Sequence, residues 1–246
     1  MALVACPDPD IKLISVSISF TFNDMRVLIV TGLIGAALFF GVAVQVASSQ
    51  AKVPTAPPGK TIFRDSDGNL ISNNEFVDIR MANFSYPDAT IVKQFEDGTV
   101  EFRLQKVPQE GMKAPNFSVK TLDGKGITLA DLIGKVVVLN FWFIGCPACL
   151  DMEPKLNAFM AKFAGNDEVV FLAMTSDPPS DLRKYLGKVR FDYQHAADAK
   201  AAMESFVFAG YPKNIVISKT GEIVYWRSTI KAWDKFESVV RAELRK

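Results

Sequence analysis

Two cysteines separated by two residues form the part of this chain best suited to chemistry. The sequence Cys146-Pro147-Ala148-Cys149 directly follows the apolar run 136–143, and a segment with a helical pattern follows it. Thiols at a strand-to-helix junction can close into a disulfide and reopen with little movement of the backbone. The start of a helix also offers unpaired N–H groups and the positive end of its dipole, which stabilise a thiolate. We therefore predict that Cys146 is the nucleophile of thiol–disulfide exchange, that Cys149 is the resolving thiol, and that Pro147 occupies the first helical position.

Two other roles for the cysteine pair fit the sequence less well. A tetrahedral zinc site takes four ligands, and only Cys6 and the single histidine, His195, remain as soft candidates. A purely structural bridge is disfavoured because so short a loop constrains little of the unfolded chain. We expect no metal and no cofactor. His195 lies in a predicted edge strand, residues 191–195, away from the motif, so we do not expect it to act as a catalytic base.

Composition narrows the classes of partner. The chain has 246 residues, with 28 Lys and Arg against 27 Asp and Glu, and its net charge is +1. No basic stripe is present, so we expect no nucleic-acid partner. The three cysteines, two of them in one motif, do not form a disulfide scaffold.

An uncharged apolar segment lies near the N-terminus, at residues 27–47. Its length matches a bilayer-spanning helix and exceeds the core of a typical signal peptide. We therefore predict a membrane anchor within residues 25–50, with a cleaved export signal as the alternative. Three aspartates precede Met25, which is unusual before an export signal, so we interpret residues 1–24 as an upstream extension of the reading frame. Either form would place the rest of the chain outside the cytoplasm.

The remaining chain divides into a linker and two folded parts. Residues 51–60 are rich in proline and indicate an extended linker. Residues 61–108 contain two hairpin-like stretches, 62–71 and 91–104, and predict a small, mostly β module that docks a partner or caps the next domain. Residues 109–246 alternate strands with helices and end in a hairpin and a helix, which is typical of an α/β domain with a mixed sheet. Its predicted strands are 117–120, 136–143, 169–175, 214–218 and 222–227; its predicted helical segments are 128–133, 147–164, 180–186, 199–206 and 233–244.

Four motifs together resemble the thioredoxin-like thiol–disulfide oxidoreductases of the TlpA/ResA group. They are Ala114-Pro115-Asn116-Phe117, the run 138–142 leading into the cysteine pair, Pro154, and Gly210-Tyr211-Pro212 before the last hairpin. The resemblance covers about residues 111–246 and implies a thioredoxin-like fold. Members are anchored or exported and mostly reduce disulfides outside the cytoplasm, often in cytochrome c maturation. It implies protein thiol or disulfide substrates, a membrane or periplasmic electron donor, and a location on the periplasmic side of the inner membrane, reached here through residues 27–47.

The resemblance assigns further residues to the site. Pro212 matches the family's cis-proline, whose role is to present the backbone of Tyr211 to a substrate; the alternative is an ordinary turn proline. Trp142 is expected to support the site from four residues before Cys146. Gly145 stands directly before Cys146, where many thioredoxins have tryptophan, so the rim of the active site next to Cys146 has no bulky side chain there.

Two polar residues differ from the family pattern or from thioredoxin itself. Asn140 stands where thioredoxin has a buried aspartate, and an amide cannot act as a base. Glu153 is a candidate acid or base, but related proteins often carry the glutamate at the position of Met152. One residue turns a helix face by about 100°, so we expect Glu153, beside Pro154, to be a solvated carboxylate. Pro154 itself should kink the predicted helix.

Three other functions remain open on the sequence. A disulfide-forming oxidase would use the same cysteine pair, and the sequence does not fix the direction of electron flow. A peroxiredoxin-like activity is disfavoured because Phe143 stands where that chemistry needs threonine or serine. The third alternative is a binding module whose cysteines are structural. We predict an exported reductase as the leading function.

Overall fold

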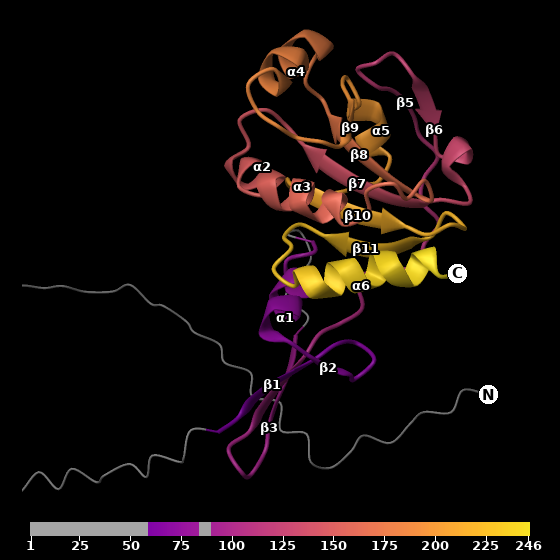
Figure 1. Ribbon diagram of the computed structural model, residues 1–246. Coiled ribbons are helices and arrows are strands. Elements are labelled where there is room, and N and C mark those ends of the chain that lie inside the picture. Colours follow the sequence, from indigo (N-terminus) through magenta and orange to yellow (C-terminus); the bar gives the residue numbers. More distant parts are fainter. Residues whose placement is uncertain (1–58, 84–89) are drawn as a thin grey trace, which may run out of the picture. The chain divides into compact units, whose positions relative to one another are not determined.

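The computed structural model describes residues 59–83 and 90–246 (Figure 1). The predicted upstream extension (1–24), the predicted anchor or signal (25–50) and residues 51–58 of the predicted linker lie outside these residues. In the part of the chain that is described, no helix has the length and apolar character needed to cross a bilayer.

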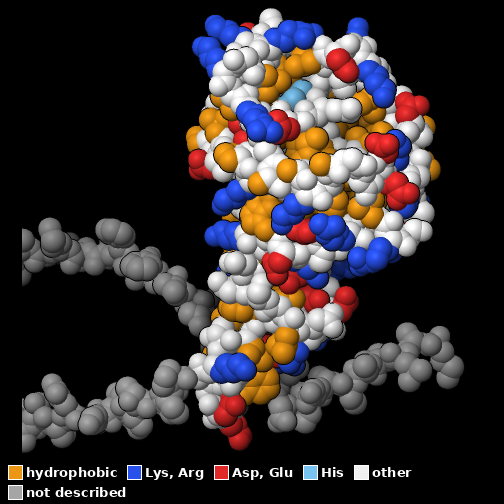
Figure 2. Space-filling model, viewed as in Figure 1, with side chains coloured by type: hydrophobic (Ala, Val, Ile, Leu, Met, Phe, Trp, Pro, Cys, Tyr) orange, Lys and Arg blue, Asp and Glu red, His pale blue; other side chains and the backbone are white. Residues whose placement is uncertain are grey.

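The β-module, residues 61–108, is built on a four-stranded sheet. Its elements are β1 (Thr61–Arg64), β2 (Leu70–Ile71), α1 (Asn73–Arg80), β3 (Ile91–Gln94) and β4 (Val100–Arg103). Strands β1 and β2 form one predicted hairpin and β3 and β4 the other, while parallel pairing of β1 with β4 joins them. Hydrophobic side chains reach the surface of the module (Figure 2), among them Leu70, Ile91, Val92 and Phe95.

Helix α1 is an element that the strand patterns did not predict. Its N-cap, Ser72, accepts the N–H of Glu75 at 3.1 Å. Serine followed three residues later by glutamate is the capping-box pattern of a helix start, so a signal was present in the sequence. Phe76 of α1 packs on Phe63 and Phe102, with ring centroids 4.5 and 6.0 Å apart, and this three-ring cluster forms the core of the module.

The C-terminal domain, residues 109–246, is built around a five-stranded sheet. Its elements are β5 (Ser118–Lys120), β6 (Gly126–Thr128), the 3-10 turn η1 (Ala130–Leu132), β7 (Val136–Trp142), α2 (Pro147–Leu150), α3 (Glu153–Ala161), β8 (Val169–Thr175), α4 (Pro179–Leu186), β9 (Gln194–Ala196), α5 (Lys200–Glu204), β10 (Lys213–Ile217), β11 (Ile223–Arg227) and α6 (Trp233–Leu244). The strand order is β11-β10-β7-β8-β9; β7, β8 and β9 are parallel, and β10 is antiparallel to β7 and to β11. The predicted mixed sheet is confirmed.

Alternate residues of β7 enter two separate hydrophobic cores. Val138 and Trp142 join the core formed with α3 and α6, which also holds both cysteines. Leu139 and Phe141 point into the core formed with β5, β6 and α5. Every residue of β7 is buried, as expected for a central strand covered on both faces.

The predicted helix 147–164 is two helices. Helix α2 ends at Leu150, and α3 begins at Glu153. Pro154 explains the break, because it has no N–H to donate and its ring would collide with the carbonyl of Leu150, four residues earlier. A single kinked helix was therefore wrong in detail, and the break changes which way the residues after the cysteines face.

Asp78 connects the β-module to the C-terminal domain. Its side chain is only 2% exposed. It accepts the hydroxyl of Thr229 at 2.9 Å and the backbone N–H groups of Lys231 and Ala232 at 2.8 Å. Ala232 is the N-cap of α6 and has no side-chain cap of its own. A carboxylate from the module therefore binds the two backbone N–H groups directly before α6, near the end of the helix where the dipole favours negative charge.

Candidate active site: a disulfide beside a proline loop

The cysteine pair forms a disulfide immediately after β7. Cys146 is the N-cap of α2 and is bonded to Cys149, with their Cα atoms 5.3 Å apart. Pro147 takes the first helical position, as predicted. Cys146 is 4% exposed and Cys149 is 3% exposed, so both cysteines are buried in the hydrophobic core. The local structure is the strand-to-helix junction that the sequence indicates.

The backbone around Cys146 is arranged for a sulfur with negative character. The N–H of Cys149 points at the Cys146 sulfur, 3.3 Å away. Helix α2 has only four residues, so this local N–H contributes more directly than a long helix dipole would. Gly145 has φ +87° and nothing within 4 Å of where a Cβ would lie. A side chain there would be strained by the backbone rather than by crowding, and the rim before Cys146 is open.

The proline loop lies beside the cysteine loop. The Tyr211–Pro212 peptide bond is cis, as the resemblance implies. The ring of Tyr211 packs edge-on against Phe143, which follows β7, and against Phe208, with both centroid distances at 5.1 Å. Partial burial, with nearby negative charges, raises the pKa of Tyr211. Aromatic contact thus joins the two loops that the sequence placed in one site.

Asp177 is a site residue that the sequence analysis missed. Its carboxylate accepts the N–H of Ile144 at 2.8 Å and the hydroxyl of Thr175 at 2.5 Å. Ile144 lies two residues before Cys146, so Asp177 fixes the loop that carries the first thiol. A signal existed, because Asp177 follows β8 closely and parallel neighbouring strands end at the same edge of a sheet, here the edge where β7 meets the cysteines.

Glu153 corrects an expectation. It is 3% exposed, not a solvated carboxylate. The hydroxyl of Tyr185 lies 3.0 Å from both of its carboxylate oxygens. Burial raises the pKa of Glu153 despite that hydrogen bond, and burial together with the carboxylate raises the pKa of Tyr185 to about 12. Glu153 faces inward because α3 starts at it, so its direction does not follow from counting along a helix that begins at Pro147.

Trp142 and His195 pack together in the core. The ring of Trp142 lies 5.5 Å from those of Tyr185 and Phe191, and 5.7 Å from that of His195. Trp142 therefore lies in the same hydrophobic core as the two cysteines. His195 lies on the edge strand β9, as predicted, and its Nε2 lies 2.9 Å from the carbonyl oxygen of Phe191. Burial lowers the pKa of His195, which keeps the imidazole neutral.

Comparison with known proteins places this geometry in a family. Residues 111–226 match the family described as the AhpC/TSA family. Over 117 residues the chain is 31% identical to "Thioredoxin-like protein YneN" of Bacillus subtilis (strain 168), covering 47% of this chain and 69% of that protein. It is 28% identical over 117 residues to "Thiol-disulfide oxidoreductase ResA" of Bacillus thuringiensis (strain Al Hakam), covering 47% and 68%. The chain belongs to the thioredoxin-like thiol–disulfide oxidoreductases.

A solved structure supports the same fold. The solution structure of a "putative protein disulfide isomerase" from Bacteroides thetaiotaomicron superposes with a TM-score of 0.51 at 24% identity, covering 56% of this chain and 91% of that one. In this thioredoxin-like domain, the mixed sheet carries the cysteine pair at the end of β7 and Pro212 directly before β10. Strands β7 and β10 are hydrogen-bonded neighbours, which brings the two loops to one end of the sheet.

A buried amide pair lies where thioredoxin would have a single carboxylate. Asn140 donates to the side-chain oxygen of Asn214 at 2.9 Å, across the β7–β10 register, and Asn214 donates to the sulfur of Met152 at 3.5 Å. Both asparagines are buried. The pair is satisfied without a titratable group, so this thioredoxin-like site has no buried base at that position. Asn214 was not singled out in the sequence.

No cofactor is needed for the chemistry that this arrangement supports. Across residues 59–83 and 90–246, no group of three or more His, Cys, Asp or Glu side chains could hold a metal ion. The Cys146–Cys149 disulfide is itself the redox group. The site can accept two electrons as a disulfide and donate them as a dithiol.

Proposed function

We propose that the protein is an exported thiol–disulfide oxidoreductase that reduces disulfides in extracytoplasmic proteins. The observation that supports this most strongly is the Cys146–Cys149 disulfide at the end of β7, beside the Tyr211–Pro212 loop. A bridge that closes so short a loop adds little to stability, whereas a thiol pair at a helix start is suited to exchange. The substrate disulfide would lie along the backbone of Tyr211.

Each cycle of the proposed reaction moves two electrons. In the reduced protein, the thiolate of Cys146 attacks one sulfur of the substrate disulfide, that disulfide breaks, and the leaving sulfur takes up a proton. The thiolate of Cys149 then attacks the Cys146 sulfur in the mixed disulfide, which releases the second substrate thiol. The protein is left with the Cys146–Cys149 disulfide. A membrane or periplasmic dithiol donor returns the two electrons.

Export and anchoring rest on residues 27–47, which have the length of a membrane span and no charge. We infer that this segment holds the protein in the inner membrane, with the thioredoxin-like domain on the periplasmic side. Maturation of cytochrome c is one process that fits a reductase in this location. Cell fractionation with added protease tests the location: the protein should sediment with membranes and be cut only from the outside. A soluble product that begins near residue 48 would indicate a cleaved signal instead.

Trapping of mixed disulfides tests the two cysteine roles. In a Cys6→Ser background, Cys149→Ser should accumulate a covalent adduct with disulfide-bonded insulin, because the second attack has been removed. Cys146→Ser is the matched control and should form no adduct and reduce no insulin. Adducts on Cys149 in the Cys146→Ser protein would show that the roles are reversed. If neither variant forms an adduct with insulin and the wild type does not reduce it, the Cys146–Cys149 disulfide is a structural bridge.

The direction of electron flow is tested with the same protein. A reductase should transfer electrons to insulin faster than its oxidised form introduces disulfides into a reduced, unfolded protein. The reverse order would identify the oxidase alternative, which uses the same two sulfurs.

A further inference from the structure

Lys213 is a fully buried cation directly after the proline of the candidate site. It is 0% exposed and is the first residue of β10, immediately following Pro212. Its partner across the sheet is Phe141 of β7, on the face opposite to the disulfide. Lys213 therefore does not reach the sulfurs, but its backbone is continuous with the loop that faces them.

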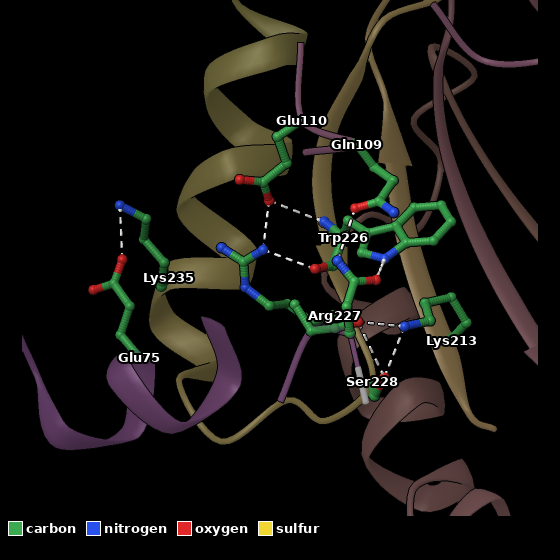
Figure 3. Close-up of polar contacts among 10 residues, drawn as sticks. Glu75, Gln109, Glu110, Lys213, Trp226, Arg227, Ser228 and Lys235 are labelled. Carbon is green, nitrogen blue, oxygen red and sulfur yellow. Dashed lines mark hydrogen bonds and ion pairs between the residues drawn. The ribbon is translucent and has the colours of Figure 1, made fainter. Parts of the chain in front are cut away.

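The ammonium group of Lys213 has two hydrogen-bond acceptors, both uncharged (Figure 3). It donates to the carbonyl oxygen of Ala82 at 2.6 Å and to the hydroxyl of Ser228 at 2.7 Å. Its nitrogen also lies 5.1 Å from the centre of the Trp226 ring, a cation–π contact. Ala82 belongs to the β-module, 131 positions away in the sequence. The proline loop is thus tied to the module by one side chain.

No carboxylate neutralises this cation within residues 59–83 and 90–246. The charged groups on the elements around it are engaged elsewhere: Arg227 with Glu110 at 2.5 Å, Glu75 with Lys235 at 3.1 Å, and Asp78 with Thr229, Lys231 and Ala232. Burial, together with repulsion from Arg227, lowers the pKa of Lys213 to about 7. Ala82 follows the C-cap of α1, Met81, so the negative end of that helix offsets part of the charge.

If position 213 served only to fill space in the core, an apolar residue would be more favourable there than a lysine. Burying a charge without an opposite charge is unfavourable, and a buried ionic group can often be replaced by an apolar one without loss of stability. A neighbouring contact between the domain and the module forms without Lys213: the indole N–H of Trp226 donates to the Asn83 side chain at 2.9 Å. The feature that only a long donor at position 213 provides is the link from the proline loop to Ala82.

We propose that Lys213 is a positioning residue that fixes the Tyr211–Pro212 loop against the β-module, so that the loop is ready to receive a substrate disulfide. The inference rests on the proposed function. It gives the module a defined role, since the carbonyl of Ala82 is an anchor for a loop that contacts substrate. It also predicts that the loop, and not the reactivity of the thiols, depends on Lys213.

The test compares two reactions of the same full-length variants. Lys213→Met keeps the length of the side chain and removes its donors. With insulin as substrate, kcat/KM should fall about tenfold or more, because a small displacement of a positioning group has effects of that size. The rate at which iodoacetamide alkylates Cys146 in the reduced protein should stay within about twofold, since that small reagent needs no loop. Lys213→Gln, which restores a shorter donor, should recover part of the insulin activity.

Ser228→Ala is the matched control, because it removes the other acceptor of Lys213, and with it the 3.5 Å contact of the Ser228 hydroxyl with the Ala82 carbonyl oxygen, but leaves the Lys213–Ala82 hydrogen bond. Its insulin kinetics should be close to wild type. Wild-type kinetics in a folded Lys213→Met protein would overturn the inference and leave the proposed function intact. Failure of the wild-type protein to reduce insulin would instead overturn the proposed function. If Lys213→Met does not fold, Lys213→Leu takes its place. If neither folds, Lys213 is required for the fold itself and the positioning role is wrong.

Discussion

The β-module and the thioredoxin-like domain are stabilised in different ways. Every residue of β7 and β10 in the domain is buried, whereas none of the residues in the module's four strands is. The domain has two hydrophobic cores, one on each face of its sheet. The module has three packed rings and a set of buried polar contacts to the domain. A small core stabilises little by itself, so the module depends on the domain for its position.

This difference divides the active site into two halves. The cysteine half is held by β7, and the core on the disulfide's face of β7 consists of domain residues. The proline half is held partly by the module, through Lys213 and the carbonyl of Ala82. Changes at the contact between the two parts should therefore affect module docking and the proline loop more than the cysteine pair. Basic and acidic side chains also lie close together near this contact, and Glu75 and Lys235 form one such pair (Figure 3).

Among the predicted changes at the contact between the module and the domain, Asp78→Ala should lower the free energy of unfolding the most. The change leaves the N–H groups of Lys231 and Ala232 without their acceptor at the start of α6. Buried donors that lose a partner cost about 1–3 kcal/mol each, so the free energy of unfolding should fall by roughly 3 kcal/mol in urea titrations. Asp78→Asn is the control and should lose less, because it keeps one acceptor oxygen. A loss in Asp78→Ala of the size seen for an exposed residue would mean that the module is held by its apolar contacts alone.

The second prediction concerns the pH dependence of stability. Lys213 has a pKa of about 7 in the folded protein, against an ordinary value of 10.5. Between these values the unfolded chain binds more protons, so the free energy of unfolding should rise with pH in that window and be lowest below pH 7. Relative to Lys213→Met, the wild type should gain about 3 kcal/mol between about pH 6 and pH 9. A constant difference between the two proteins across that range would show that Lys213 keeps its ordinary pKa.

A smaller effect is expected at the cysteine half from Asp177→Ala. The change removes the acceptor for the Ile144 N–H and frees the loop before Cys146. The cost to stability should be about 1 kcal/mol, the usual worth of one hydrogen bond. In Asp177→Ala, the rate of Cys146 alkylation and the rate of insulin reduction should both change, because the loop that moves carries the thiol. In Lys213→Met, only the rate of insulin reduction should change. Asp177→Asn keeps an acceptor and should lie close to wild type; no change in either rate would mean that the loop needs no anchor.

The smallest effect is expected from Lys235→Gln, at the partly exposed ion pair with Glu75, in which the Lys235 side chain is 49% exposed. Surface pairs of this kind contribute about 0.5 kcal/mol or less, and salt screens them. The unfolding free energy should therefore differ from wild type by no more than this, at low or high salt. A loss as large as that of Asp78→Ala would show that the surface pair, and not the buried carboxylate, attaches the module.

Patterns within short segments of the sequence correctly predicted the elements that depend on those segments alone. The continuous apolar runs of β7 and β8 and the amphipathic pattern of α6 appear at the predicted positions. The cysteine loop and the Pro212 loop lie at one end of the sheet, in contact through Phe143 and Tyr211, and the resemblance correctly implied the fold. These features depend on spacing within short segments, which the sequence displays directly.

The features that were missed depend on contacts between distant segments. Nothing near Asp78 in the sequence indicates that it binds the backbone directly before α6, and nothing near Lys213 indicates Ala82 as its acceptor. Glu153 was misjudged for a different reason: its direction was counted along one continuous helix, and the break before Pro154 restarts the count. Two missed features did have a readable signal: helix α1 has the capping box at its start, and Asp177 follows β8 at the edge of the sheet where β7 also ends.

The central claim is that Cys146 and Cys149 form an exchanging pair rather than a structural bridge, and a redox titration tests it most directly. The Cys6→Ser protein would be equilibrated in thiol–disulfide buffers of graded potential, and its free thiols counted by mass after alkylation. We expect one reversible two-electron transition within the range of exchange proteins, about −270 to −120 mV. A pair that stays oxidised below about −300 mV, where structural disulfides lie, would contradict the account.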